Sequence, residues 1–265
     1  MKNKSIYTVI TGASMGLGKA LATECARRGN NLIIVALPHQ NIDNFRSYLI
    51  STYNIKVVCF EADLTVEGEV DKIVNEINDK YVVDTLINNA GVGGSKSFQE
   101  ASKGYVDNIV LLNIRATVML THGLINNLKQ QKAAYILNIS SMASFSPMPL
   151  KTVYPASKAF IYSFSRGLYA ELKDTGIFVS VAHPGGMATN KEISDRINQH
   201  SQIVRSTILS PEKTAEICIR RLYKKDALII PGIMNKVSYL FMKICPTWLQ
   251  LICYRNAISK ELQLG

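Results

Sequence analysis

Residues 154–158, YPASK, place a phenol and a primary amine four residues apart in a stretch with the pattern of a helix start. Residues four apart lie on one face of a helix, so Lys158 can hold its ammonium near the Tyr154 phenol. The pKa of a free tyrosine is about 10, and a nearby positive charge favours the phenolate. Ser140 and Ser141, at the end of an apolar run, offer a hydroxyl to a carbonyl oxygen that receives a proton from Tyr154. These residues predict acid–base chemistry at a carbonyl or alcohol oxygen.

Pro155 decides where Tyr154 lies in its helix. A residue that precedes proline is displaced from helical backbone angles, whereas proline is tolerated within the first turn of a helix. We therefore expect Tyr154 at the very start of a helix that continues through Lys158.

A glycine-rich turn, TGASMGLG at residues 11–18, follows the first apolar run and opens the first helical pattern. Glycines permit a tight turn and a close backbone approach to a ligand, and the free N–H groups of a helix start attract phosphate. The pattern favours a pyrophosphate site over a plain strand-to-helix connection. It differs from the Walker motif because neither Ser nor Thr follows Lys19, which excludes a P-loop ATPase.

Two further turns follow apolar runs. NNAG at 88–91 and HPGGMAT at 183–189 each read as a simple turn when taken alone, but doubly wound sheets bind ligands at such strand ends. Thr189 could reach a cofactor amide or phosphate. We expect His183 to be a packing residue at a strand end rather than a catalyst.

Short apolar runs alternate with helical patterns along most of the chain, which predicts right-handed crossovers and a parallel sheet covered on both faces. The expected strands are 6–11, 31–37, 55–60, 82–88, 134–140, 177–183 and 227–231. Between the first two strands, Leu17, Leu21 and Cys25 lie on one helical stripe, and the later helical patterns cover 41–53, 66–79, 105–128 and 155–174. Nothing resembling a linker interrupts them, so we predict an α/β fold with a doubly wound sheet of about seven strands in a single domain.

Bulk composition agrees with one globular domain. The 265 residues are 47% hydrophobic, with a mean hydropathy of +0.08. The N-terminus lacks the pattern of a secretory signal, so a cytoplasmic protein is expected. The five cysteines form no C-x-x-C pair, which favours reduced, buried thiols over disulfides and predicts no metal site.

The net charge of +10 lies mostly near the C-terminus, where residues 213–260 carry nine basic and two acidic residues. A solvated face is the simplest interpretation, and anionic ligands or a membrane surface are the alternatives. Residues 237–254 are apolar but too short and interrupted to span a membrane. We expect this segment to be a lid or an oligomer contact, with a helix on an anionic membrane as the alternative. Nucleic-acid binding is not expected, because no recognised motif accompanies the charge.

Taken in order, these motifs resemble the short-chain dehydrogenase/reductase family from about residue 6 to about 232. The resemblance implies a Rossmann-type sheet that binds NAD or NADP and passes a hydride to or from a carbonyl carbon. Residues 1–232 would form the catalytic domain, and 233–265 a helical extension of it. The family suggests a homodimer or homotetramer, often assembled through the helices at 105–128 and 155–174.

The resemblance also implies roles for single residues. Tyr154 would be the general acid in reduction, Ser141 would orient the carbonyl, and Lys158 would bind the ribose and lower the tyrosine pKa. Asn113 would support a relay water. The cofactor would be held by Gly12, Ser14, Gly16, Leu17, Gly18, Asp63, Leu64, Asn89, Ala90, Gly91, Tyr154, Lys158, Pro184, Gly185 and Thr189.

Cofactor choice and substrate are less specified. Leu37 stands where the family often carries an acid for NAD or an arginine for NADP, and the missing acid favours NADPH, with His39, Asn41 or Arg46 near the extra phosphate. Residues 136–172 resemble the 3-oxoacyl-CoA reductase and hydroxysteroid dehydrogenase branch, which implies an extended apolar substrate. Its pocket would include Ser141, Met142, Phe145, Met148, Tyr154 and Met187. An NAD-dependent alcohol dehydrogenase and a scaffold without turnover are the alternatives.

Overall fold

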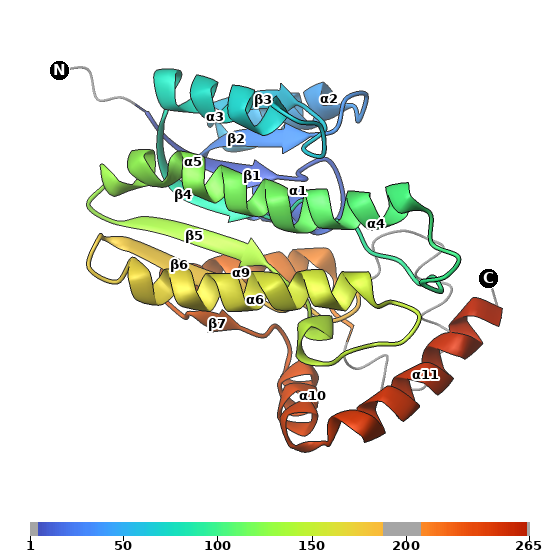
Figure 1. Cartoon of the computed structure of the whole chain (residues 1–265). Helices are drawn as coiled ribbons and strands as arrows, with labels where there is room; N and C mark the ends of the chain where they lie inside the picture. Colours follow the sequence, from blue (N-terminus) through green and yellow to red (C-terminus); the bar gives the residue numbers. More distant parts are fainter. Residues whose placement is uncertain (1–4, 188–207, 264–265) are drawn as a thin grey trace.

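The computed structural model describes residues 5–187 and 208–263, and its centre is one parallel sheet of seven strands (Figure 1). The strands are β1 (Ile6–Thr11), β2 (Asn31–Ala36), β3 (Val57–Glu61), β4 (Val82–Asn88), β5 (Ala134–Ile139), β6 (Ile177–Ala182) and β7 (Leu228–Ile229). Their order is β3-β2-β1-β4-β5-β6-β7, so the order reverses between β1 and β4. Reversal at this point opens a crevice at the carboxyl ends of the strands.

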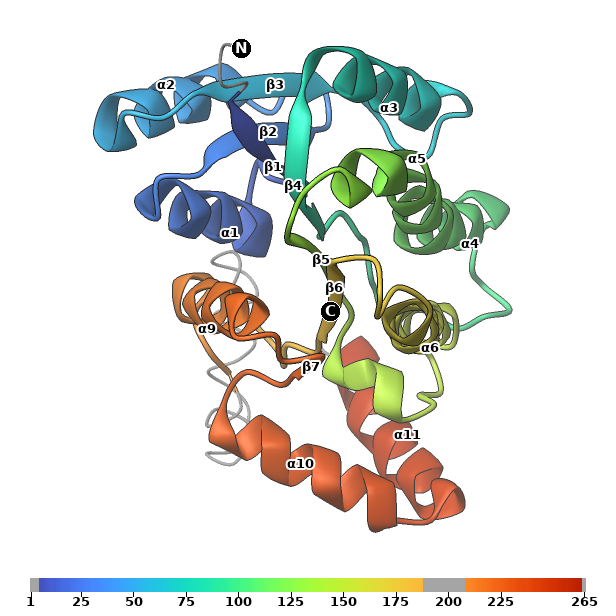
Figure 2. The same ribbon diagram turned by 90° about the vertical axis from the view of Figure 1, so that its left-hand side faces the viewer.

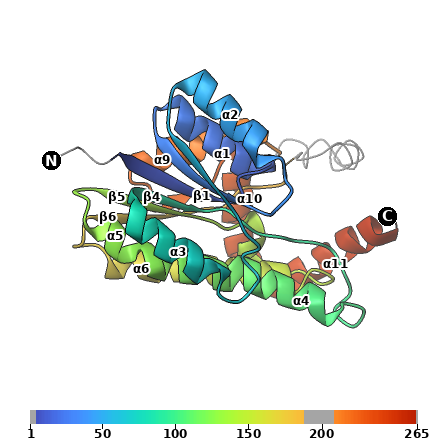
Figure 3. The ribbon, with the colours of Figure 1, turned by 90° about the horizontal axis from the view of Figure 1, so that it is seen from above.

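Helices cover both faces of the sheet (Figures 2 and 3). One layer consists of α1 (Gly16–Arg27), α2 (Ile42–Tyr53) and α9 (Pro211–Tyr223). The other contains α3 (Glu69–Lys80), α4 (Lys103–Val110), the π-helix η1 (Leu111–Ala116), α5 (Thr117–Lys129) and α6 (Val153–Glu171). A short 3-10 helix, η2 (Met142–Phe145), links β5 towards α6.

The core forms because successive strand residues point to opposite layers. In β1, Val9 packs with the α3, α5 and α6 layer, and the next residue, Ile10, packs with the α1, α2 and α9 layer. Ile33 and Ile34 divide in the same way on β2. Both faces of the sheet are thus buried, which explains why the strands read as continuous apolar runs instead of alternating ones.

Two helices extend beyond the β7 edge of the sheet. They are α10 (Ile233–Ile244) and α11 (Thr247–Gln263), and they form a bent arm below the main body in Figures 1 and 2. Gln250 joins them, because its Nε2 donates to the carbonyls of Met242 at 2.8 Å and Cys245 at 2.6 Å at the end of α10. These bonds satisfy carbonyls that a helix end leaves unpaired.

The seven-stranded, doubly wound sheet expected from the sequence is confirmed. The expected strand 227–231 is reduced to Leu228–Ile229, since β7 pairs on one side only and Pro231 has no N–H to donate. The expected helix 105–128 contains the π-helical turn η1. The thiols of Cys25 and Cys218 are buried as expected, but Cys253 is exposed on α11, so the burial expected of all five was wrong.

The helical run Lys103–Lys129 is long and apolar enough to cross a membrane by length and composition. Here it belongs to the core, because Leu120, Leu124 and Leu128 are buried in the same cluster as the α3 side chains Ile73 and Ile77.

Candidate active site

A cavity of about 530 Å³ lies at the carboxyl ends of the central strands. Most of the residues predicted to bind cofactor or substrate line it: Gly12, Ser14, Leu17, Gly18, Asp63, Leu64, Asn89, Ala90, Gly91, Ser141, Tyr154, Lys158, Pro184, Gly185 and Met187. The structure thus brings together residues that are up to 175 positions apart in the chain. Thr189 lies outside the described residues.

The glycine-rich turn admits no side chain at two of its positions. Gly12 has a left-handed φ of 66°, and a Cβ there would lie 2.9 Å from Cα of Ala90. A Cβ on Gly18 would collide with the carbonyl of Gly12 and come within 2.5 Å of the Asn89 amide. Gly16 lines a neighbouring hollow instead of this cavity, but it begins α1, whose first turn receives no side-chain cap. The backbone N–H groups in the first turn of α1 therefore remain available to an anion.

Asn89 and Thr11 hold the turn against the end of β4. The Asn89 Nδ2 donates to the carbonyls of Thr11 at 2.9 Å and Gly12 at 3.2 Å. In return, the Thr11 hydroxyl accepts from the backbone N–H groups of Asn89 and Ala90, both at 3.0 Å. The NNAG motif therefore holds the glycine-rich turn in place and also forms part of the cavity wall.

The cavity wall after β3 is fixed by a local network. Asp63 Oδ1 accepts from the N–H of Thr65 at 2.9 Å and from its hydroxyl at 2.7 Å. Arg115, on the π-helix η1, donates to the Thr65 carbonyl at 2.7 Å. These bonds orient Asp63, which was predicted to lie near an adenine, with one carboxylate oxygen committed to the protein.

Tyr154 lies at the start of α6, as the Pro155 argument predicted, and it lines the cavity together with Ser141. Ser141 Oγ also accepts from the N–H of Ala143 at 3.1 Å, which leaves its hydroxyl proton for the phenol or for a carbonyl oxygen. Burial raises the pKa of Tyr154 above its usual value near 10, and the Ser141 side chain opposes this only in part. The phenol therefore keeps its proton at neutral pH.

Lys158 is buried beneath Tyr154. Its Nζ lies 6.0 Å from the centre of the Tyr154 ring and donates to the carbonyl of Ile139 at 3.0 Å. Burial lowers the pKa of Lys158 to about 8. Burial is the largest influence on the pKa of Tyr154 and the net shift is upward, and the expectation that Lys158 lowers this pKa stays a prediction.

Asn113 is buried in the π-helical turn behind the cavity and does not line it. Its side chain accepts from the N–H of Val92 at 2.8 Å and donates to the Val92 carbonyl and to Ser157 Oγ, both at 2.9 Å. Ser157 in turn donates to the carbonyl of Tyr154 at 2.7 Å. Asn113 thus ties the loop after β4 to the first turn of α6, and its role with a relay water stays a prediction.

Ser140 and His183 contact the backbone carbonyls of the two site residues Lys158 and Ser141. The Ser140 hydroxyl donates to the Lys158 carbonyl at 2.8 Å, which leaves Ser141 as the serine that meets Tyr154. His183 is fully buried, with its Nδ1 3.1 Å from the Ser141 carbonyl and 2.8 Å from Ser144 Oγ. Burial lowers the pKa of His183 to about 4, so it stays neutral. These contacts fit the packing role expected of it.

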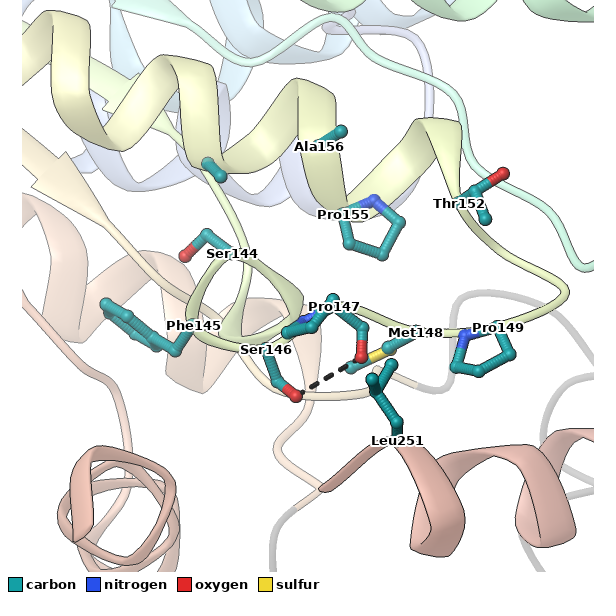
Figure 4. A pocket seen from close by; sticks show the side chains of 11 residues that line it. Ser144, Phe145, Ser146, Pro147, Met148, Pro149, Thr152, Pro155, Ala156 and Leu251 are labelled. Atoms are coloured by element: carbon teal, nitrogen blue, oxygen red, sulfur yellow. Dashed lines mark hydrogen bonds between the residues drawn. The ribbon is translucent and has the colours of Figure 1, made fainter. Parts of the chain in front are cut away.

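A second cavity, of about 540 Å³, shares no lining residue with the first. Figure 4 shows it between the loop after η2, the start of α6 and the α11 side chain Leu251. Phe145 and Met148, expected beside the substrate, line this second cavity. Met142 lines neither, because it begins the turn of η2 next to Ser141. Only Met187 of the expected apolar side chains lines the cavity with Tyr154.

Sequence reasoning missed Gly93 and Ser157. A Cβ on Gly93 would lie 3.0 Å from two ring carbons of Tyr154, so this glycine makes room for the phenol. Ser157 bridges Asn113 and the start of α6. Signals for both were present, since Gly93 follows the NNAG motif closely and Ser157 lies inside YPASK.

The residues present fit a dinucleotide. Glycines whose neighbours leave no room for a Cβ line one part of the cavity, an uncapped helix start adjoins it, and a buried ammonium and a phenol line another part. A diphosphate beside the glycines and the helix start, and a redox-active ring beside the ammonium and the phenol, would match these groups.

Comparison with known proteins agrees with this geometry. A family model described as short chain dehydrogenase matches residues 7–200. The chain is 29% identical over 244 residues to 17-beta-hydroxysteroid dehydrogenase type 3 of Mus musculus, covering 90% of this chain and 80% of that protein. It is 33% identical over 192 residues to very-long-chain 3-oxoacyl-CoA reductase of Anas platyrhynchos, covering 69% of this chain and only 60% of the reductase.

Among solved structures, the chain resembles a short-chain dehydrogenase from Sphingobium yanoikuyae in complex with NADPH, with a TM-score of 0.78 and 27% identity. The match covers 86% of this chain and 88% of that one.

Proposed function

Because the chain belongs to the short-chain dehydrogenase family and is an NAD(P)-dependent oxidoreductase of alcohol and ketone groups, we propose that it reduces a carbonyl on an apolar substrate. NADPH is the proposed cofactor. The observation that carries the proposal is that Ser141, Tyr154 and Lys158 line one cavity together with the glycine-rich turn. Ser141 and Tyr154 offer two hydroxyl groups to one carbonyl oxygen, which suits the reduction of a carbonyl.

In the proposed reaction the bound cofactor supplies a hydride to the carbonyl carbon. Ser141 donates a hydrogen bond to the carbonyl oxygen, and Tyr154 gives that oxygen its hydroxyl proton as the negative charge develops there. The Lys158 ammonium, buried near the ring, stabilises the phenolate that Tyr154 becomes. Asn113 and Ser157 keep the start of α6 in place while this happens.

The preference for NADPH rests on the end of β2. Val35, Ala36, Leu37 and Gln40 line the cavity there, and none of them is an acid that would repel a 2′-phosphate. Asn41 and Lys19 line the hollow next to it, together with Ser14. His39 and Arg46 line neither, so the structure does not support the phosphate contacts expected of these two residues.

We expect titration with NADPH and with NADH, followed by nicotinamide fluorescence, to give the lower dissociation constant for NADPH, by about tenfold or more. Lys19→Glu should reduce this preference, whereas Lys132→Glu, the same change in the loop before β5, should leave it unaltered. Equal or tighter binding of NADH by the unmodified chain would contradict the NADPH assignment and favour oxidation of an alcohol.

The proposed substrate class is a ketosteroid-like or 3-oxoacyl thioester carbonyl. Two curated relatives carry such names, a hydroxysteroid dehydrogenase and a 3-oxoacyl-CoA reductase. The cavity around Tyr154 also contains the apolar side chains of Val92, Leu112 and Met187.

We further propose a cytoplasmic homodimer or homotetramer that assembles through the α4 to α5 run and α6. The exposed apolar side chains Val110, Met119 and Phe160 on these helices support such a contact. Size-exclusion chromatography with light scattering reports the assembly state directly.

A further inference from the structure

Helix α10 presents an apolar face to solvent. The outer apolar face consists of Ile233, Val237, Leu240, Phe241 and Ile244, spaced so that all five lie on one side of the helix. Ile233 and Ile244 are 80% and 83% exposed, and Phe241 is 65% exposed. A helix on the surface of a globular domain turns its apolar stripe to the core, so this helix has the reverse orientation. We propose that the outer apolar face docks the protein on an anionic lipid surface.

The opposite side of α10 is fixed to the body of the protein. Tyr239 packs on Phe145 with ring centres 4.5 Å apart, and Asn235 donates to the Pro231 carbonyl at 2.7 Å. Asn235 also fills the space beside Gly185, where a Cβ would lie 2.7 Å from its Oδ1. Because these contacts set the rotation of α10, the outer apolar face cannot turn inward without opening the cavity wall at Gly185.

The helix that follows continues the exposed surface. Trp248, Leu249, Leu251 and Ile252 in the first turns of α11 are exposed, and the bonds from Gln250 hold α11 against the end of α10. Tryptophan is enriched where proteins meet the interface of a bilayer. The two helices thus offer two apolar surfaces joined by one rigid turn.

The positive charge near this surface favours an anionic lipid, rather than a second copy of this chain, as the binding partner. No acid occurs from Ala227 to Lys260, whereas this stretch carries four Lys and Arg residues. Lys236 and Lys243 lie on α10 beside the apolar stripe, and the Lys243 Nζ lies 5.0 Å from the centre of the Tyr239 ring at the edge of this stripe. Long lysine side chains at such an edge can extend to lipid headgroups. Two copies that met through this surface would bring like charges together, whereas an anionic leaflet attracts them.

The docking surface adjoins the second cavity. Leu251 is exposed on α11 and also lines that cavity, pointing towards Pro147 and Met148 in Figure 4. An apolar molecule that leaves a docked leaflet would meet this cavity next to η2, which carries Ser141 as its N-cap. The docking surface thus borders the second cavity, which the η2 residues Ser144 and Phe145 also line.

Flotation of the full chain with phosphatidylcholine vesicles, with and without phosphatidylserine, tests the proposal. We expect binding to the anionic vesicles and much weaker binding to the neutral ones. Phe241→Ser should lower the partition coefficient about tenfold, because one large apolar side chain is lost from the interface. Lys243→Glu should lower it by about as much on anionic vesicles and have little effect on neutral ones.

Matched variants separate docking from general effects. Phe98→Ser makes the same change at a side chain that is 61% exposed elsewhere, and Lys132→Glu makes the same charge change in the loop before β5. Both should bind vesicles like the unmodified chain. No flotation of the unmodified chain with anionic vesicles would overturn the proposal. A stable dimer that Phe241→Ser dissociates, with no vesicle binding, would overturn it in favour of a second copy. Lys243→Glu keeps the test valid if Phe241→Ser folds poorly.

Discussion

Replacement of Tyr154 by phenylalanine is expected to lower kcat for carbonyl reduction about a thousandfold while the dissociation constant for NADPH stays nearly unchanged. The phenol lines the cavity with Ser141, and because burial raises its pKa it holds a proton to donate at neutral pH. General acid catalysis contributes about 10² to 10⁴ in rate, so loss of this single oxygen removes that factor. The remaining ring still fills the space beside Gly93, so the fold should be preserved.

The matched control is Tyr169→Phe, on the same helix, where the ring packs on Phe178 with centres 5.4 Å apart. This variant should keep the kcat of the unmodified enzyme. Steady-state rates and nicotinamide fluorescence measured on both variants separate turnover from binding. Retention of kcat by Tyr154→Phe would remove Tyr154 from the mechanism, and joint loss of NADPH binding would indicate a damaged cavity instead.

Replacement of Lys158 by methionine is expected to lower kcat at least a hundredfold and, at pH 7, to make the protein more stable. Removing a preorganised charge costs about that factor in rate. The pKa of Lys158 is lowered from 10.5 to about 8 by burial, which corresponds to about 3 kcal/mol of destabilisation while the amine is charged. Loss of the bond to the Ile139 carbonyl offsets about 1 kcal/mol, which leaves a gain of about 2 kcal/mol.

The pH dependence of this gain identifies its cause. Below about pH 8 the amine is charged in both the folded and the unfolded chain, so its burial carries the full cost. Between about pH 8 and 10.5 the Lys158 amine is protonated only in the unfolded chain, so the unmodified protein regains stability as pH rises. The stability gained by Lys158→Met therefore disappears over this range. Urea unfolding at pH 7 and pH 10 measures this difference, with Lys173→Met at an exposed lysine as the control. A constant difference across this range would contradict the assignment.

The sequence carried enough information to place the chemistry along the chain. Apolar runs ending at TGAS, NNAG, NISS and HPGG predicted strand ends, and in a parallel sheet these ends meet at one edge. The position of Tyr154 followed from Pro155 alone, since proline is tolerated only in the first turn. Both inferences use local backbone rules, which is why they hold without knowledge of the tertiary contacts.

Features that depend on tertiary contacts were not predictable. A π-helical turn has the same apolar pattern as an ordinary helix, so the resemblance identified Asn113 but not the turn that holds it or its bonds to Val92 and Ser157. The pKa of Tyr154 depends on burial that residue spacing does not contain. Likewise, the amphipathic pattern of α10 was visible in the sequence, but its orientation depends on contacts such as that of Tyr239 with Phe145.

The most direct test of the account is whether the purified chain oxidises NADPH in the presence of an apolar ketone. Absorbance loss at the reduced-nicotinamide band should match, mole for mole, the alcohol formed from a ketosteroid or a 3-oxoacyl thioester, and Tyr154→Phe should abolish both signals. The account would be contradicted if the chain bound NADPH tightly but reduced no carbonyl and, with NADP, oxidised none of the matching alcohols. The function would then be that of a nucleotide-binding scaffold.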